Sequence, residues 1–227
     1  MPRPWTLLDS VATPEGLLEL RRRGERDFMI SIAGRVLMTS MITRSELTLA
    51  ERGCGAIAHV RAPRVLLGGL GLGFTLRAAL DALPSQARVV VAELNPRVVE
   101  WCQGPASGAA SAAALDPRVE FVAGDVTEEV RRVAENPGLP RYDAILWDLY
   151  VGPGDAPAAE RDPLYGKISV RRAFAALSPR GVFGVWGESP TPTFETRLKK
   201  TGFTTELVRT KGGGLHHLVF LGTRPPS

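Results

Sequence analysis

From Arg64 onward, short apolar runs alternate with segments of helical character, and this alternation restricts the fold more than any other feature of the chain. The runs are short and rich in Val, Leu, Ile or Phe, which is typical of strands buried within a sheet. Strands that alternate with helices predict a parallel sheet covered by helices on both faces. The predicted strands are Val65–Leu67, Arg88–Ala92, Val119–Val122, Tyr142–Trp147 and Gly181–Trp186.

Helices are predicted after each of these strands, and one of them begins with Pro96 in its first turn, where proline is well tolerated. Two closing strands, Phe203–Arg209 and His216–Leu221, have the turn Gly212–Gly214 between them, so we expect an antiparallel pair at one edge. The predicted fold class is therefore α/β, a Rossmann-like sheet that is mostly parallel with an antiparallel edge strand. The predicted helices are Thr75–Leu83, Pro96–Gln103, Val126–Glu135, Leu164–Leu177 and Phe194–Thr201.

The N-terminal part does not follow this alternation. Pro14–Arg23 has the pattern of a short helix, whereas Phe28–Ile32 and Arg35–Met38 flank the pair Ala33-Gly34 and predict a β-hairpin. A helix is expected over Ser45–Ala58, with Ser45 or Thr43 as its N-cap. We therefore predict a small N-terminal extension of hairpin and helix over residues 1–60, and a Rossmann-like domain over residues 61–227.

The composition restricts the class of protein. With 227 residues and 44% hydrophobic residues, the chain can bury one sizeable core. The net charge of +4 is spread over several segments, which favours solvated helix faces over a nucleic-acid footprint. No apolar run approaches the ~20 residues that span a bilayer, and the N-terminus does not resemble a signal peptide. We expect a cytoplasmic protein with a small-molecule substrate and no membrane or nucleic-acid partner.

A glycine-rich turn, Gly68–Gly73, follows the first predicted strand. Its spacing, Gly69-x-Gly71-x-Gly73, differs from the dinucleotide fingerprint G-x-G-x-x-G, and no Gly-Lys-Ser/Thr follows as in a P-loop. Glycines here let a ligand approach main-chain amides closely. The turn favours the nucleoside-binding loop of S-adenosylmethionine enzymes, although such a turn also serves plain strand-to-helix packing.

Carboxylates follow the next two predicted strands, at the sheet edge where ligands of open parallel sheets bind. Glu93, with Leu94 next to it, comes about twenty residues after the glycines, at the interval suited to binding ribose hydroxyls. Asp125, together with the backbone amide of Val126, can read the edge of an adenine ring. Asp125 can equally cap the helix that begins at Val126, and both interpretations hold if different oxygens are used.

The fourth predicted strand is followed by Asp148 and Tyr150, at the position that would face the reacting end of the ligand. We predict that these two residues are catalytic, and that Asp148 also contacts the cofactor. Tyr165, Trp186 and Glu188 are weaker candidates for a substrate pocket. No metal site is expected, because His216 and His217 have no carboxylate or cysteine cluster near them in the sequence.

Taken as an ordered set, several segments give a resemblance to a known family. From about Phe28 to the C-terminus, the chain resembles the spermidine synthase-like branch of the class I S-adenosylmethionine-dependent methyltransferase fold. The resemblance implies that the glycine loop, Glu93 and Asp125 bind the adenosine part of an S-adenosylmethionine-type donor. The matching segments are Val65–Arg77, Val91–Val99, Asp116–Asp125, Tyr142–Asp148, Leu164–Lys167 and Leu177–Ser189.

The departures from that family concern its aminopropyl chemistry. Leu72 stands where aminopropyltransferases carry Asp, and after Asp148 the family's second Asp is missing. The Tyr-His-Glu triplet of the family is also missing around Ser45-Glu46. A diamine needs carboxylates to hold it and a base to deprotonate one amine, so these departures argue against polyamine synthesis.

The predicted function is therefore a methyltransferase that uses S-adenosylmethionine on a small molecule, with Asp148 or Tyr150 orienting or deprotonating the nucleophile and S-adenosylhomocysteine as product. An alternative enzyme transfers or cyclises the three-carbon arm of the donor and releases methylthioadenosine. A third interpretation is a catalytically decayed binding protein. Nucleic-acid methylation is not favoured, because no Asn/Asp-Pro-Pro-Tyr/Phe motif follows the fourth strand. We expect the loop Leu149–Pro163 to act as a lid, and an apolar hairpin such as Phe28–Met38 to pair in a homodimer.

Overall fold

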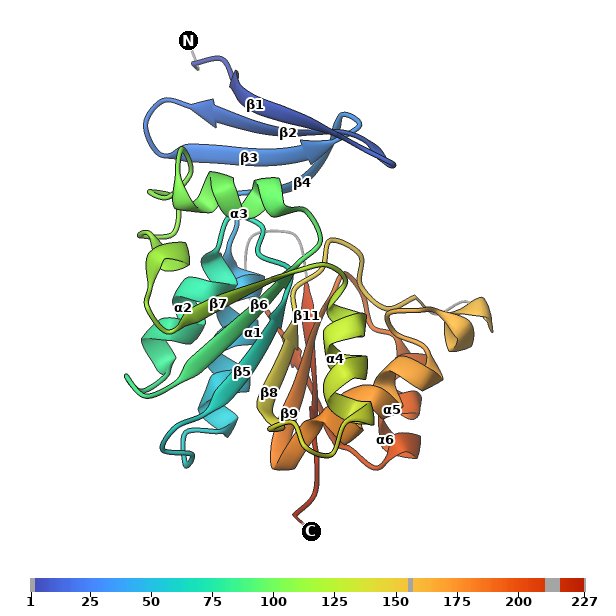
Figure 1. Ribbon diagram of the computed structural model, residues 1–227. Helices are drawn as coiled ribbons and strands as arrows, with labels where there is room; N and C mark the ends of the chain where they lie inside the picture. The colour runs from blue at the N-terminus through green and yellow to red at the C-terminus, as the bar shows by residue number, and fades with distance from the viewer. Residues whose placement is uncertain (1–2, 155–156, 211–216, 227) are drawn as a thin grey trace.

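The computed structural model describes residues 3–154, 157–210 and 217–226, which form a four-stranded and a seven-stranded sheet (Figure 1). The small sheet is built from β1 (Thr6–Thr13), β2 (Gly16–Arg23), β3 (Asp27–Ile32) and β4 (Arg35–Thr39). The large sheet is built from β5 (Arg64–Gly68), β6 (Arg88–Glu93), β7 (Val119–Ala123), β8 (Tyr142–Trp147), β9 (Leu177–Gly187), β10 (Thr204–Arg209) and β11 (Leu218–Thr223).

The large sheet has the strand order β10-β11-β9-β8-β5-β6-β7. Strands β5 to β9 run parallel, whereas β11 pairs antiparallel with β9 and β10 antiparallel with β11. This confirms the predicted α/β class with an antiparallel edge. The chain proceeds outward from β5 through β6 to β7, then returns to β8 on the other side of β5. Strand order therefore reverses between β5 and β8, and a crevice forms there beyond the strand ends.

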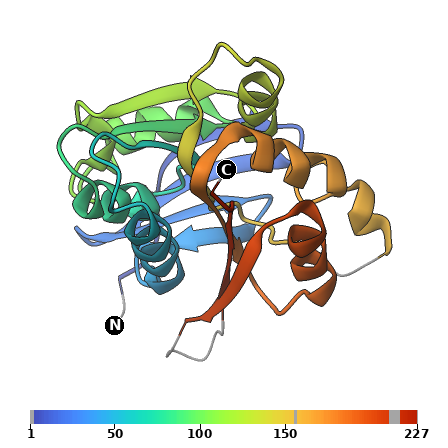
Figure 2. The ribbon, with the colours of Figure 1, turned by 90° about the horizontal axis from the view of Figure 1, so that it is seen from below.

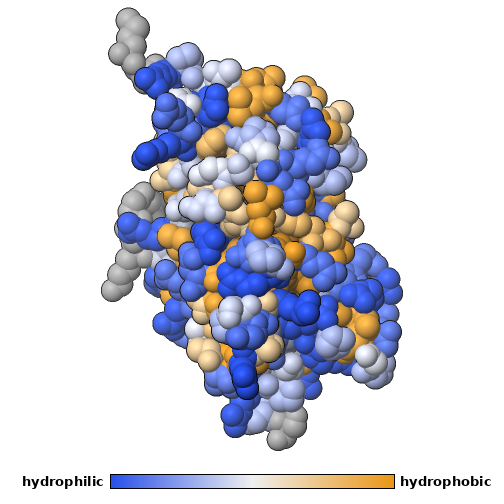
Figure 3. Space-filling view, turned by 60° about the vertical axis from the view of Figure 1, so that its left-hand side comes forward, coloured by the Kyte–Doolittle hydropathy of each residue, from blue (hydrophilic) through white to orange (hydrophobic). Residues whose placement is uncertain are grey.

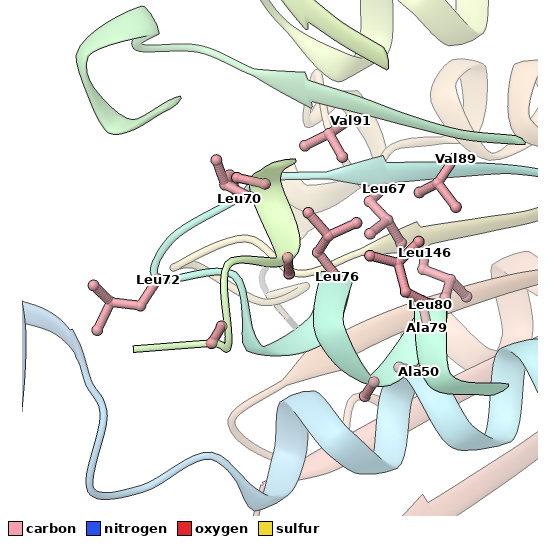
Figure 4. Packing of buried hydrophobic residues seen from close by; sticks show 14 of the residues in the cluster. Ala50, Leu67, Leu70, Leu72, Leu76, Ala79, Leu80, Val89, Val91 and Leu146 are labelled. Carbon is pink, nitrogen blue, oxygen red and sulfur yellow. The ribbon is translucent and has the colours of Figure 1, made fainter. Parts of the chain in front are cut away.

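Helices cover both faces of the large sheet (Figure 2). Helices α1, α2 and α3 share one apolar cluster with the sheet, and α4, α5 and α6 share the other. Figure 4 shows Leu76 of α2 packed with Leu67 and Leu146 of the sheet, beneath the loop that carries Leu72. The helices are α1 (Arg44–Ala56), α2 (Phe74–Ala82), α3 (Pro96–Gln103), α4 (Val126–Glu135), α5 (Lys167–Ala176) and α6 (Pro192–Thr201), with short 3-10 turns at Ala113–Leu115 and Pro157–Arg161.

The prediction of a helix over Pro14–Arg23 is wrong, because Gly16–Arg23 forms β2 between β1 and β3. Leu18 and Leu20 are buried while Leu17 is exposed, which is the two-residue period of a strand. The residues of this segment are good helix formers, but strand partners on both sides override that weak preference. The hairpin of β3 and β4 is confirmed, with positive φ at both turn residues, Ala33 and Gly34.

The small sheet lies across the end of the large sheet and next to α3 (Figure 1). Its buried side chains belong to the same apolar cluster as α1, α2 and α3. Asp9 of β1 accepts hydrogen bonds from Trp101 Nε1 at 2.7 Å and from Arg97 Nε at 2.7 Å, both on α3. Met38 of β4 reaches the glycine loop, where its sulfur lies 3.0 Å from the backbone nitrogen of Leu72. The small sheet therefore closes over the strand ends where ligands would bind.

Several helix boundaries in the structure differ from the predicted ones. The expected helix Leu164–Leu177 is shorter, because α5 begins at Lys167 and Leu177 already belongs to β9. Thr43 is the N-cap of α1, without a side-chain hydrogen bond. The turn Gly212–Gly214 and His216 lie outside the described residues, as does a short part of the predicted lid loop.

Within the described ranges, no helix combines the length and apolar character needed to cross a membrane. Figure 3 shows hydrophobic residues in small groups among hydrophilic ones on the face that it presents. Scattered hydrophobic groups of this kind are ordinary on protein surfaces.

The contact between α1 and β8 generates a stability prediction. Gly53 of α1 faces Leu146, and a Cβ added at Gly53 would overlap the Leu146 side chain. Gly184 confines the same Leu146 methyl group from another side, since a Cβ added at Gly184 would lie 2.8 Å from it. Gly53→Ala is therefore expected to lower the free energy of unfolding by about 1–3 kcal/mol through overpacking. Gly55→Ala is the matched control, because a Cβ there meets nothing within 4 Å. Urea denaturation of both variants tests this; equal stabilities would contradict it.

Candidate functional site

The glycine loop between β5 and α2 depends on backbone conformations that suit glycine. Gly69, Gly71 and Gly73 have φ of 84°, 52° and 86°. A Cβ at Gly69 would lie 2.6 Å from the carbonyl oxygen of Asp148, and one at Gly71 would overlap the sulfur of Met38. The loop is therefore pressed between the end of β8 and the small sheet, and three of its glycines are needed for that path.

Glu93, at the end of β6, is folded onto this loop. Its Oε2 accepts the N–H of Leu70 at 2.8 Å, and its Oε1 accepts the N–H of Asn95 at 2.9 Å. Burial raises the pKa of Glu93, and its hydrogen bonds to backbone N–H groups act in the opposite direction. The backbone N–H groups of Leu94 and Gly71 also lower this pKa, so four N–H groups of the loop and the strand end stabilise the carboxylate.

The edge of the sheet beyond β6 and β7 presents Leu94 and Asp125. Leu94 is 68% exposed, although leucine side chains are usually buried. Asp125 is the N-cap of α4, and its Oδ1 accepts from the N–H and the hydroxyl of Thr127, both at 2.8 Å. The capping interpretation is confirmed. Since both bonds use Oδ1, Oδ2 remains for a ligand, and the next residue, Val126, is the first of the helix.

Asp148 lies at the reversal point of the strand order, directly after β8. Its N–H donates to the carbonyl oxygen of Gly68 at 2.9 Å, and its carboxylate accepts the hydroxyl hydrogen of Thr75 on α2. Burial raises the pKa of Asp148 to about 7, and the charge of Glu46 adds to the effect, while the hydrogen bond from Thr75 lowers it. A carboxyl group with this pKa can hold or release a proton near neutral pH.

Glu46 is a residue that sequence reasoning did not select as a site residue. It lies in the first turn of α1, where an acid usually serves only to complement the helix dipole. In the structure Glu46 is buried, accepts a hydrogen bond from Ser45 at 2.7 Å, and influences Asp148 electrostatically. The only signal in the sequence was the Ser45-Glu46 pair at the start of a predicted helix.

His217 and Trp186 border the same cluster. Ser45 Oγ lies 3.1 Å from Nδ1 of His217, just before β11, and the rings of Trp186 and His217 meet edge to face with centroids 5.0 Å apart. Trp186 was predicted as a pocket residue, whereas His217 was considered only as a metal ligand. Among the described residues, no group of three or more His, Cys, Asp or Glu side chains could hold a metal ion.

The other predicted residues have different surroundings. Tyr150 points toward the small sheet, where its hydroxyl lies 2.9–3.0 Å from the Glu15 carboxylate, so the structure does not aim it at Asp148. Tyr165 is buried in the core, and its hydroxyl donates to the carbonyl oxygen of Val151 at 2.6 Å. A core position with an occupied hydroxyl does not fit the predicted pocket wall. Glu188 is exposed beyond the end of β9.

Two surface hollows lie away from this cluster. One of about 410 Å³ lies between β1 and α3, lined by residues such as Leu8, Asp9 and Trp101. The other, of about 290 Å³, lies between α1 and the edge of the large sheet, near Arg52 and Glu206. Neither is lined by Asp148 or Glu93, so the functional assignment depends on the polar groups at the strand ends.

No family model matches the chain. Spermidine synthases are among the solved structures that share its fold. A spermidine synthase in complex with the transition-state analogue AdoDATO has a TM-score of 0.72 at 17% identity, over 97% of this chain and 73% of that one. The spermidine synthase from Thermotoga maritima has a TM-score of 0.70 at 19% identity, over 97% and 74% of the two chains. The chain therefore has a class I methyltransferase-like fold. More specifically, its architecture is spermidine synthase-like, and the 97% coverage means that the shared architecture includes the small sheet.

The raised pKa of Asp148 generates a prediction for stability against pH. The ordinary pKa of an Asp side chain is 3.8, as expected in the unfolded chain, whereas burial and Glu46 raise the pKa of Asp148 to about 7 in the folded protein. Between these values the folded state keeps a proton that the unfolded chain has lost, so this group's contribution to stability falls as the pH rises from about 4 to about 7. Asp148→Asn keeps an oxygen for Thr75 and removes the titration.

The variant is expected to have a higher Tm than the wild type at about pH 8, with the difference vanishing near about pH 4. Thermal unfolding followed by circular dichroism over this range checks the prediction. Glu25→Gln, at an exposed position, controls for the loss of one negative charge. Parallel curves of Tm against pH for Asp148→Asn and the wild type would contradict the raised pKa of Asp148.

Proposed function

We propose that the chain is a transferase that binds an S-adenosylmethionine-type sulfonium donor and alkylates an amine on a small molecule, with release of methylthioadenosine. The observation that carries the proposal is the carboxyl pair of Asp148 and Glu46, placed beside the glycine loop at the point where strand order reverses. A cationic donor and an amine acceptor both favour such a pair.

The adenosine part of the donor would lie along the ends of β5, β6 and β7. Glu93, at the end of β6, would accept the ribose hydroxyls. Leu94, exposed at the sheet edge, would cover one face of the adenine ring, and Asp125 Oδ2 with the Val126 N–H would read its polar edge. The glycine loop would border the donor, and Gly69 and Gly71 keep the loop in the narrow path between the Asp148 carbonyl and Met38.

The carboxyl pair suits the positive charge of the sulfonium donor and that of the acceptor ammonium. A sulfonium bound near Asp148 and Glu46 would favour their ionised forms, and the pair would hold the cation against its lost hydration. Asp148, with its pKa raised to about 7, would take a proton from the acceptor ammonium. The free amine would then attack the carbon next to the sulfonium. The new C–N bond would form as the C–S bond breaks, and the electron pair would go to sulfur, leaving a neutral thioether.

Glu46 is the reason for favouring transfer of the three-carbon arm. The sequence lacks the second Asp after β8, and that absence argued against the spermidine synthase-like alternative. Glu46 is a buried carboxylate on α1 whose charge acts on Asp148, so it would supply an amine with the second acid that the segment after β8 lacks. The similarity in architecture to spermidine synthases, one of them bound to AdoDATO, supports this alternative as well.

Methyl transfer is the second candidate, and Leu72 favours it. Leu72 is buried and its N–H faces the sulfur of Met38, so the glycine loop offers no carboxylate to the ammonium group of a three-carbon arm. An enzyme of this kind would break the bond between sulfur and the methyl carbon and release S-adenosylhomocysteine.

Calorimetry with S-adenosylmethionine, decarboxylated S-adenosylmethionine and methylthioadenosine tests the donor. We expect at least one sulfonium to bind, and Glu93→Ala to weaken that binding roughly tenfold or more, because two hydroxyl hydrogen bonds to a carboxylate are lost. Glu100→Ala, at an exposed position on α3, is the control. No detectable binding of any of the three ligands would contradict the proposal.

Mass spectrometry after incubation with a panel of small amines then identifies the bond that breaks. Methylthioadenosine as product supports the favoured candidate, and S-adenosylhomocysteine supports methyl transfer. Asp148→Asn is expected to lower kcat by about a hundredfold or more, since it removes the base. Unchanged turnover in this variant would exclude Asp148 as the proton acceptor.

A further inference from the structure

A chain of hydrogen bonds leads from His217 to the buried carboxyl pair. The Ser45 hydroxyl donates to Glu46 Oε2 at 2.7 Å and lies 3.1 Å from His217 Nδ1. A hydroxyl carries one hydrogen, and here it points to Glu46, so the hydrogen between Ser45 and the imidazole must belong to Nδ1. His217 therefore donates to Ser45 and Ser45 donates to Glu46, with both hydrogens directed toward the carboxylate.

The position of His217 is fixed from two sides. Its carbonyl oxygen accepts the N–H of Thr210 at 3.1 Å and the hydroxyl of Thr210 at 2.8 Å, which joins the ends of β10 and β11. Its ring meets Trp186 edge to face, and Trp186 pairs with Val219 in the neighbouring strand. The imidazole is thus placed by the sheet.

We propose that His217 is a positioning residue of this site: through Ser45 it orients the Glu46 carboxylate so that its charge acts on Asp148. The consequence for catalysis rests on the proposed function, whereas the hydrogen-bonded chain exists without a donor. The charge of the oriented Glu46 adds to the raised pKa of Asp148, the carboxyl that would take the proton of an acceptor amine.

Every ionisable group that acts on Asp148 bears on its titration. Glu46 comes from α1, Asp148 follows β8, and His217 precedes β11. Tyr165 lies in the segment before α5, and burial together with the charges of Asp162 and Asp148 raises the pKa of its phenol. It stays neutral near pH 7 and adds no charge there. The charge that adds to the raised pKa of Asp148 is that of Glu46, so the orientation of Glu46 matters for this pKa.

Without the chain of hydrogen bonds, the Glu46 carboxylate is no longer held in place, and its charge acts less on Asp148. The carboxyl of Asp148 is then expected to titrate at a lower pH than in the wild type, because the charge of Glu46 adds to its raised pKa. The carboxyl carbon shift of Asp148, in protein labelled with ¹³C at Asp, follows this titration in the full chain and without any ligand.

Two substitutions separate hydrogen bonding from ring packing. His217→Phe keeps a ring against Trp186 and removes the donor, so we expect it to shift the titration of Asp148. His217→Asn keeps an N–H near the position of Nδ1 and removes the ring, so we expect titrations like those of the wild type. His59→Asn, at an exposed position after the end of α1, is the control for loss of a histidine. The reverse pattern, a shift with Asn and none with Phe, would overturn the proposal.

Ser45→Ala provides a second test if the Phe variant does not fold. Because it interrupts the chain at its centre, it is expected to shift the titration of Asp148 in the same direction. Wild-type titrations in Ser45→Ala would also overturn the proposal. Calorimetry with the same three ligands on the same samples tests the proposed function separately. Absent ligand binding would contradict the proposed function, whereas the titrations alone decide whether His217 is a positioning residue.

Discussion

The close approach of the glycine loop to the end of β8 is the constraint on which the proposed site depends. Gly68 and Gly69 leave room for neighbours that a side chain would displace, since a Cβ at Gly68 would lie 2.9 Å from Trp147 and one at Gly69 would lie 2.6 Å from the Asp148 carbonyl oxygen. The hydrogen bond from the Asp148 N–H to the Gly68 carbonyl fixes the two strand ends together. Because these strands flank the reversal of strand order, the approach places Asp148 at the mouth of the crevice.

The small sheet determines how deeply that mouth is buried. Met38 contacts the loop, Asp9 fastens the sheet to α3, and Glu15 contacts Tyr150 of the segment after β8. Carboxyl groups enclosed in this way lose hydration, and their charges interact more strongly than they would in water. Burial raises the pKa of Asp148 in this way, and the charge of Glu46 adds to the effect.

The sequence could predict the elements whose partners are close in the chain or whose pattern is strong. The apolar runs from Val65 to Trp186 indicated five strands, and the hairpin of β3 and β4 followed from its alternation and its turn. The segment Pro14–Arg23 was wrongly predicted as a helix, because Leu, Glu and Arg favour helices locally while the partners β1 and β3 are visible only once the sheet has formed. Tyr165 shows the same limit, since its burial depends on Trp147 and Phe194 from other elements.

The sequence by itself determined the positions that follow each parallel strand, namely the glycines after β5, Glu93, Asp125 and Asp148. It determined them because a parallel sheet always brings its carboxyl ends to one edge. Only the tertiary structure brought Glu46, Ser45 and His217 to that edge, since Ser45 and His217 lie 172 residues apart in the chain and no periodicity links them. The charge of Glu46, which adds to the raised pKa of Asp148, comes from such a distant element, so the chemistry of the proposed site is a property of the packed chain.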